Sequence, residues 1–478
     1  MKTTGNLIIF LFLVSIVSCK KSGTTNTPPP NPPSTANYIT SFILTASDNP
    51  GLPVNDTATI NNDTIRLTVP YGANVSSLKP TITIIGTSVN PPSGIGQNFS
   101  GSVNYIVTAE SGAQRTYVVI VKVKVKSMLF IASANKLYAL DGDSGNLKWS
   151  LTLAGQVTEE ASPAYYNGLV YIATTDGKMN AVDAVSGIMR WTYLTDGSAS
   201  YVTPAINSGI LYFGGSRAPF STVSLYALNA STGALVWKYL PGTNLSPLGN
   251  PTIKNGRIFV AGNLQGLFCF DANTGTLLSS LNGSICGSSN PLVINNTVYA
   301  PTETSIITAY NSQSGAVVWT YGSTLGTGVK CSPTYHNGKI FNACSNSYLY
   351  ALDTFGNMKW RYIPDYITNS YFSSPIVANG MVYAGNTDSY FFALDENTGV
   401  KKWQTLIPSS GLTYLQSNCT IKDDLVFVGS SDNNLYALNA FTGAITWQFN
   451  TGAPVYGGAC VLAEDQTVYH PGISGEQQ

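Results

Sequence analysis

The chain has 478 residues, only 10% of them charged, and its 24 basic and 24 acidic side chains give a formal net charge of zero. Phosphate binding needs a basic face, so this balance argues against a nucleic-acid partner. Sparse charge with 28 tyrosines and many Thr, Ser and Asn residues suits strands whose outer faces are polar but uncharged, and therefore favours an all-β protein.

The first nineteen residues have the layout of an export signal. Lys2 precedes an apolar run from Leu7 to Val17, which is too short to cross a bilayer as a stable helix. The run ends in IVSC, which resembles a bacterial lipobox. The resemblance implies that Cys19 is lipidated and becomes the mature N-terminus. An ordinary signal peptide followed by a chance cysteine is the alternative.

The residues after this cysteine bear on location. Lys20 and Lys21 stand there rather than acidic residues. By resemblance to lipoprotein sorting signals, this argues against retention in the inner membrane, and the lack of an acidic run argues against surface export. We therefore expect an outer-membrane lipoprotein, on the periplasmic face more than on the cell surface. Residues 20–37 include TPPPNPPST, which favours an extended tether of about 50 Å at roughly 3.1 Å per residue.

Residues 38–126 are expected to form a separate small β-domain. Alternating segments such as DTIRLTVP and PTITIIGT have the period of strands, and turn signals such as Asn49-Pro50-Gly51 separate them. The ending VTAESGAQRTYVVIV resembles the Ig-like modules near the N-terminus of many bacterial lipoproteins. That resemblance implies an Ig-like β-sandwich acting as a spacer or docking module.

Residues 127–478 are built from one repeated phrase. It appears as LYALDGDSGNLKW at Leu137–Trp149 and returns every 40 to 46 residues, the period of a four-stranded propeller blade. The copies contain all seven tryptophans of the chain: Trp149, Trp191, Trp237, Trp319, Trp360, Trp403 and Trp447. An eighth copy, LFCFDANTGTLLS, ends in Ser279 instead.

The frame from Ala393 to Trp403, Ala-x-Asp-x-x-Thr-Gly-x-x-x-Trp, resembles the tryptophan-docking motif of the quinoprotein-type (PQQ-like) propeller family. The resemblance implies that each Trp packs between neighbouring blades against the small Ala and Gly. The copy with Ser279 and Cys269 should then have a weaker or differently packed junction. The residue that begins the turn of the frame is Asp or Asn in every copy, which indicates backbone hydrogen bonding rather than proton transfer. These residues are Asp141, Asp183, Asn229, Asp271, Asn311, Asp353, Asp395 and Asn439.

Eight Trp-type segments and eight leading strands are present, but they are out of phase. The first copy lacks a leading strand, and the C-terminal GGACVLAEDQTVYHPG supplies one. We therefore predict an eight-bladed propeller closed by the N- and C-terminal strands of the repeat region, which would remove an open sheet edge. Thr467–His470 could compete with Met128–Ala132 for the second strand of the closing blade.

Candidate catalytic groups are few. The chain has only two histidines, His336 and His470, which makes a His-based metal cluster or triad implausible. Quinoprotein dehydrogenases, by the family resemblance, carry an adjacent Cys-Cys ring and an acidic and amide set for calcium, and this chain has no adjacent cysteines. We expect no catalytic residues, no metal, no cofactor and no enzymatic activity.

Six further cysteines suit an oxidising compartment. Cys331 and Cys344 lie symmetrically about the Asn337-Gly338 turn, at a position where cross-strand side chains approach closely, and form a candidate disulfide. Cys419 and Cys460 occupy equivalent positions in leading strands and are expected to be buried small residues rather than a bridge. Cys269 and Cys286 have no assignment.

The loops that enter the leading strands form the candidate binding funnel, because aromatic rings with polar tips suit peptide strands or sugar rings. The funnel residues are Tyr201, Tyr366, Tyr371, Phe372, Tyr414 and Tyr456. Packing at the start of each blade is the alternative role.

The sequence thus favours a non-catalytic binding scaffold of the cell envelope, with envelope proteins or peptides as partners and glycans as a further candidate. It resembles BamB-like lipoproteins of outer-membrane assembly, apart from the added Ig-like module. A PQQ-dependent oxidoreductase and a carbohydrate-binding envelope protein are the alternative functions.

Overall fold

The described residues of the computed structural model divide into two compact units, one within 32–122 and one within 123–470. The residues that the structure describes are 32–52, 55–69, 73–123, 127–158, 161–196, 203–215, 224–240, 249–262, 266–281, 289–302, 306–322, 331–343, 348–364, 372–408, 418–463 and 467–470. Within these ranges, no helix is long and apolar enough to cross a membrane.

The N-terminal unit contains two antiparallel sheets. The first has the order β2 (Asp56–Thr57), β1 (Tyr38–Leu44), β5 (Pro80–Ile85); the second has β3 (Thr59–Asn61), β4 (Thr64–Val69), β8 (Gln114–Val123), β7 (Val103–Thr108), β6 (Ser88–Asn90). A short 3-10 helix, η1, spans Val75–Ser77. Along β4 buried and non-buried residues alternate, as expected for a strand with one face on a core. Phe42 of β1 meets Tyr105 of β7 edge-on at 5.4 Å, so the two sheets share one core.

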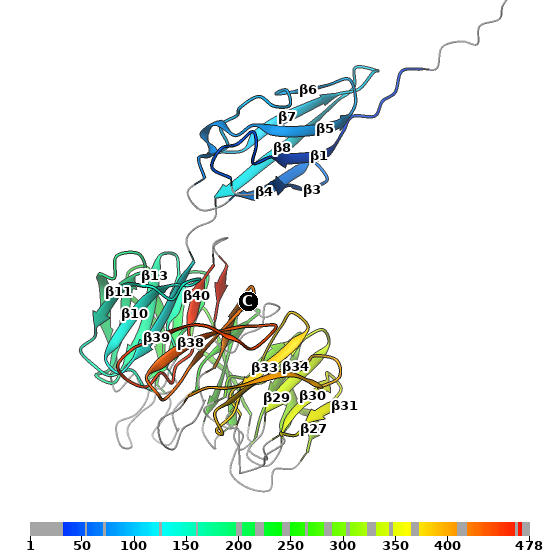
Figure 1. The fold of residues 1–478 in the computed structure, drawn as a ribbon. Coiled ribbons are helices and arrows are strands. Elements are labelled where there is room, and N and C mark those ends of the chain that lie inside the picture. Colours follow the sequence, from blue (N-terminus) through cyan, green and yellow to red (C-terminus); the bar gives the residue numbers. More distant parts are fainter. Residues whose placement is uncertain are drawn as a thin grey trace, which may run out of the picture. The chain divides into compact units, whose positions relative to one another are not determined.

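The described residues of the second unit form seven four-stranded sheets and one five-stranded sheet, all antiparallel (Figure 1). We call them blades 1 to 7 and the closing blade. In blade 6 the strands are β32 (Ile376–Ala378), β33 (Met381–Gly385), β34 (Tyr390–Asp395) and β35 (Lys401–Leu406). The sequence of this repeat, SPIVANGMVYAGNTDSYFFALDENTGVKKWQTL, predicts strands at 375–378, 382–384, 391–394 and 401–405, and the observed bounds agree to within one residue.

Blades 1 to 3 consist of β12 (Ala164–Tyr166), β13 (Leu169–Thr174), β14 (Lys178–Asp183) and β15 (Met189–Leu194); β16 (Ala205–Asn207), β17 (Ile210–Gly215), β18 (Ser224–Asn229) and β19 (Leu235–Tyr239); and β20 (Thr252–Lys254), β21 (Arg257–Gly262), β22 (Gly266–Asp271) and β23 (Leu277–Leu281). Blades 4, 5 and 7 consist of β24 (Leu292–Ile294), β25 (Thr297–Ala300), β26 (Ile307–Asn311) and β27 (Val317–Tyr321); β28 (Thr334–His336), β29 (Lys339–Ala343), β30 (Leu349–Asp353) and β31 (Met358–Tyr362); and β36 (Thr420–Lys422), β37 (Leu425–Gly429), β38 (Asn434–Asn439) and β39 (Ile445–Asn450).

A tight turn joins the first two strands of each of these blades. In blade 6 it is Asn379-Gly380, whose φ angles of 52° and 71° are those of a type I′ hairpin. Asn tolerates this left-handed region and Gly enters it without steric cost, so the sequence pair determines both the turn and the register of the two strands.

The closing blade joins the two ends of the repeat region. Its strand order is β11 (Leu147–Thr152), β10 (Lys136–Asp141), β9 (Met128–Ser133), β40 (Cys460–Leu462), β41 (Val468–Tyr469). β40 pairs with β9 through Val461 and Leu129, which confirms the predicted joining of N- and C-terminal strands. The expected competition does not occur, because β41 pairs with the other edge of β40.

Leading strands of neighbouring blades contact one another. β12 contacts β16, β16 contacts β20, β20 contacts β24, β28 contacts β32, β32 contacts β36, and β36 contacts β40. β40 also contacts β12, so the closing blade lies against blade 1. Buried clusters lie between adjacent blades rather than within a single sheet; one of them combines Phe341 of blade 5 with Val382 of blade 6.

Candidate functional site

Each described tryptophan junction joins one blade to the next. Trp360 lies opposite Ala351 of its own blade and faces Gly399 of blade 6, where an added Cβ would lie 2.6 Å from the indole ring. Its Nε1 donates to the carbonyl oxygen of Glu396 at 2.9 Å. The same arrangement of ring and glycine recurs at Trp149, Trp191, Trp237, Trp319, Trp403 and Trp447. The predicted docking role of the tryptophans is therefore confirmed.

The junction without a tryptophan is packed differently. Cys269 and Ser279 face each other across β22 and β23, and Cys269 lies in a buried cluster with Phe259 and Tyr310. Burial raises the pKa of the Cys269 thiol, so this cysteine acts as a small core residue. That this junction is weaker stays a prediction.

The Asp and Asn residues of the frame make turns, as predicted. Asp395 Oδ1 accepts hydrogen bonds from the backbone N–H groups of Asn397 and Thr398, both at 3.0 Å. Asn439 Oδ1 accepts from Phe441 and Thr442 with the same geometry. Because an amide does the same work as a carboxylate here, the position needs an acceptor and not an acid.

The residue before the tryptophan position varies with the turn residue. Asp141, Asp183, Asp353 and Asp395 pair with Lys148, Arg190, Lys359 and Lys402, at 2.7 to 3.1 Å. Blades 2, 4 and 7 have Asn in the turn and Val236, Val318 or Thr446 before the tryptophan. A hydrogen bond from Lys402 leads the interactions that lower the pKa of Asp395 to about 2. The outer strands thus differ in charge from blade to blade.

A chain of hydrogen bonds crosses the starts of the leading strands. The backbone N–H of Ser162 donates to Thr203 Oγ1 at 3.1 Å, and that of Thr203 donates to Asn250 Oδ1 at 2.7 Å. The N–H of Asn290 donates to Ser332 Oγ at 2.8 Å, and Ser332 donates likewise to Ser374 at 2.9 Å. We call these residues the polar belt.

The belt also crosses the closure of the ring. The N–H of Gly458, just before β40, donates to Ser162 Oγ of blade 1 at 2.9 Å. Sequence reasoning missed the belt. Its signal was the small polar residue before proline at Ser162-Pro163, Thr203-Pro204, Asn250-Pro251, Asn290-Pro291, Ser332-Pro333 and Ser374-Pro375.

A recess of about 270 Å³ opens on the face made by the loops that enter the leading strands. It lies between the turn after β9, the loop after β11 and the loop before β40. Ser133 Oγ lies within hydrogen-bond distance of the carbonyl oxygens of Ala453 and Pro454, at 2.9 and 3.0 Å, which ties two of these segments together. The lining residues are Ala132, Ser133, Ala134, Val157, Thr158, Ala453, Pro454, Tyr456 and Gly457.

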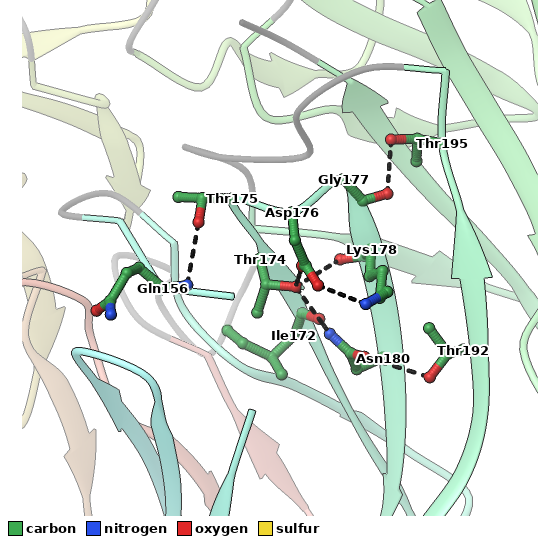
Figure 2. A network of polar contacts seen from close by, with 10 residues as sticks. All are labelled: Gln156, Ile172, Thr174, Thr175, Asp176, Gly177, Lys178, Asn180, Thr192 and Thr195. Atoms are coloured by element: carbon green, nitrogen blue, oxygen red, sulfur yellow. Dashed lines mark hydrogen bonds and ion pairs between the residues drawn. The ribbon is translucent and has the colours of Figure 1, made fainter. Parts of the chain in front are cut away.

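A polar network in blade 1 supports one wall of the recess (Figure 2). The N–H of Gln156 donates to Thr175 Oγ1 at 3.0 Å and the N–H of Thr175 donates to the Gln156 carbonyl at 2.9 Å. In the same turn Asp176 accepts from Thr174 and Lys178, both at 2.6 Å. Burial opposes ionisation of Asp176, but these bonds outweigh it and lower its pKa. The loop that supplies Val157 and Thr158 is therefore held in place.

The predicted funnel residues have different outcomes. Tyr456 lines the recess. Phe372 does not belong to an open funnel: it is 4% exposed and packs at 6.1 Å on Phe392, so its role is core packing between blades 5 and 6. Tyr201, Tyr366, Tyr371 and Tyr414 lie outside the described residues.

The described cysteines lie apart from one another. Cys419 and Cys460 are each 0% exposed, in different inter-blade clusters, and burial raises the pKa of each thiol to about 12. They are buried residues and not a bridge, as expected. Cys331 is buried with its Sγ 2.7 Å from the Phe372 carbonyl oxygen. Cys344 and Cys286 lie outside the described residues, as does Cys19.

The Cys331–Cys344 disulfide therefore stays a prediction. The hairpin register, Thr334 opposite Phe341 and His336 opposite Lys339, is the one on which the symmetric placement rests. Mass spectrometry of an unreduced digest of protein purified from the periplasm should show a peptide linked through these two cysteines. The bridge should contribute up to roughly 3 kcal/mol. Alkylation of both thiols before reduction would contradict it.

The two histidines lie in different parts of the second unit. His336 Nδ1 lies 2.9 Å from Glu396 Oε1, with Lys339 Nζ at 3.6 Å from the same oxygen, in a polar contact between blades 5 and 6. His470 follows β41, with its Nδ1 3.9 Å from Cys460 Sγ, and burial lowers its pKa to about 4. His336 thus belongs to a blade junction and His470 to the closing blade.

The described residues do not fit a bound quinone with calcium. Cys269, Cys331, Cys419 and Cys460 lie one each in four different clusters, so no two of them form a thiol pair. Across the described ranges, no three His, Cys, Asp or Glu side chains are grouped to hold a metal ion. The side chains that do cluster are engaged in turns and blade junctions.

Sheets of four strands, clamped by tryptophan and glycine and joined by a polar belt, define a β-propeller of the PQQ-like class. Residues 110–321 and 303–469 match the family model described as outer membrane protein assembly factor BamB. The chain belongs to this family. Residues 39–121 match a second family model, described as SGBP, N-terminal.

Individual relatives are distant. Tetrathionate hydrolase of Acidithiobacillus ferrooxidans is 28% identical over 234 residues, which cover 44% of this chain and 46% of that protein. Outer membrane protein assembly factor BamB of Yersinia pestis is 23% identical over 258 residues, covering 51% and 62%. The chain thus spans about half the length of these relatives. Apo AztD from Citrobacter koseri has a TM-score of 0.50 at 11% identity, covering 70% of this chain and 98% of that one, and shares the fold.

Proposed function

We propose that this protein is a non-catalytic binding scaffold of the cell envelope, with a role like that of the BamB family in outer-membrane assembly. The observation that carries the proposal is the recess beside Tyr456, on the loop face of a ring whose blades are clamped to one another. A mainly apolar hollow with one aromatic side chain suits a protein or peptide partner, since Tyr supplies large contact area at low entropic cost.

The proposal includes the arrangement of the whole chain. Seven four-stranded sheets with one closing sheet support an eight-bladed ring, and the two-sheet unit in residues 32–123 supports an Ig-like spacer. Cys19 would carry the lipid that holds the protein at the periplasmic face of the outer membrane. Replacing Cys19 by Ser should move the protein from the membrane to the soluble periplasmic fraction.

A photo-crosslinking experiment tests the binding site. A photoreactive phenylalanine analogue at position 456 should form an adduct with an envelope protein in intact cells. The matched control is position 441, because Phe441 is a 55% exposed aromatic residue in the turn between β38 and β39, away from the recess. Tyr456→Ser should abolish capture of the partner identified in this way, with the thermal transition nearly unchanged.

Three outcomes would contradict the proposal. Equal adducts at positions 441 and 456 would show that the partner does not bind specifically at the recess. Reduction of a dye acceptor by purified protein with quinone, calcium and alcohols or sugars would favour an oxidoreductase. Binding of envelope glycans that Tyr456→Ser abolishes, without a protein adduct, would favour the carbohydrate-binding alternative.

A further inference from the structure

Three consecutive blades expose outer strands that are apolar and nearly free of charge. β19, β23 and β27 are the last strands of blades 2, 3 and 4, so each has one unpaired edge among the described residues. Leu235 and Val236 of β19 are 47% and 48% exposed, Leu278 of β23 is 48% exposed, and Val317 and Val318 of β27 are 59% and 57% exposed. We call these five residues the apolar rim.

Four of the other five outer strands carry charged side chains. β11 carries Lys148, β15 carries Arg190, β31 carries Lys359 and Arg361, and β35 carries Lys401 and Lys402. Charged side chains, Lys above all, are the usual means of preventing a sheet edge from pairing with another chain. The one remaining outer strand, β39, has no charged residue but has the polar Thr446 where the rim has Val or Leu.

One cation on the rim strands is already engaged. Lys238 of β19 forms an ion pair with Asp196 of blade 1 and lies over the ring of Tyr226, 5.6 Å from its centroid. Its side chain is 21% exposed. It therefore shields the junction between blades 1 and 2 and adds little charge to the free edge, while β23 and β27 contain no charged residue at all.

The three blades are adjacent, so their edges can act together. β16 contacts β20 and β20 contacts β24, and buried clusters join Tyr212 of blade 2 to Phe270 of blade 3, and Phe259 of blade 3 to Tyr310 of blade 4. A second copy of this chain would pair one edge with one edge. Three neighbouring uncharged edges instead suit an extended, uncharged segment of another protein.

We propose that the apolar rim binds an extended, uncharged segment of another protein by β-strand addition to β19, β23 or β27. Main-chain hydrogen bonds to the free edge would supply affinity, and contact with the rim side chains would select alternating apolar residues. A basic residue at the same position of four of the remaining blades, and the polar Thr446 in blade 7, disfavour binding of the segment there. This surface is separate from the recess at Tyr456. An experiment can therefore contradict binding at one of the two surfaces without contradicting binding at the other.

Fluorescence anisotropy with a labelled twelve-residue peptide of alternating Val and Thr tests the proposal on the full chain. The triple variant Val236→Lys, Leu278→Lys, Val318→Lys should bind this peptide at least tenfold more weakly than the unchanged protein. The matched control, Ser150→Lys, Thr152→Lys, Thr446→Lys, adds the same three charges to exposed positions of β11 and β39 and should bind normally. A peptide with two central prolines, which lack the N–H donor, should not bind.

Several results would overturn the proposal: no binding of the Val/Thr peptide to the unchanged protein, equal binding by the rim variant, or equal weakening in the control variant. Dimerisation of the unchanged protein that the rim variant abolishes would assign the rim to a second copy instead. Should the triple variant fail to fold, the proline peptide decides, because it leaves the protein intact.

Discussion

Replacing Trp360 by Ala should lower the free energy of unfolding by about 3–5 kcal/mol. The indole is 7% exposed, packs at 5.8 Å against Phe341, and covers Gly399 of the next blade. Its removal leaves a cavity between blades 5 and 6 and leaves the Glu396 carbonyl without the indole donor. Denaturant unfolding monitored by circular dichroism measures the change.

Two Trp→Phe substitutions distinguish the stability that comes from the indole hydrogen bond from the stability that comes from the packing of the ring. Trp360→Phe loses the bond to Glu396, whereas Trp447 Nε1 is buried and has no hydrogen-bond partner among the described residues. An unsatisfied buried donor costs about 1–3 kcal/mol, so Trp447→Phe removes a penalty as well as some packing. Trp360→Phe should therefore be more destabilising by at least about 1 kcal/mol. Equal losses in the two variants would mean that these indole N–H groups contribute nothing to the junctions.

Removing residues 460–478 should abolish the cooperative folding of the propeller. The deletion takes away β40 and β41, and with them Cys460 and Val461, both 0% exposed, and Leu462 at 8%. Burial of three such side chains contributes about 5 kcal/mol, a large part of the 5–15 kcal/mol that holds a typical protein folded. It also leaves β9 with a free edge, which invites association with other chains.

Calorimetry and size-exclusion chromatography measure this effect. The shortened chain should show no sharp propeller transition and should elute partly as aggregate. A chain that ends at His470 keeps both closing strands and is the matched control, with the transition of the full protein. A monomeric shortened chain with an unchanged transition would show that the joining of β9 and β40 is not needed to hold the ring.

The repeat was the part of the fold most open to prediction. Strand bounds in blade 6, the Asn379-Gly380 turn and the turn role of Asp395 all followed from local rules, because hairpin geometry and side-chain acceptors act within a few residues. The position of the tryptophans between blades followed from a family resemblance and is confirmed at Gly399. The site was less predictable: Tyr456 lines a recess, but Phe372, from the same set of loops, is a core residue.

The sequence by itself determined the period, the hairpins and the pairing of the two ends of the repeat, since each depends on residues close together or on a repeated frame, while the tryptophan clamp followed from the family resemblance. Only the tertiary structure decided what lies between blades: the polar belt from Ser162 to Thr203, the contact of His336 with Glu396, the place of β41, and the three adjacent apolar edges. These features depend on which surfaces come into contact when sheets about forty residues apart in sequence pack side by side. Strand periodicity does not specify those contacts.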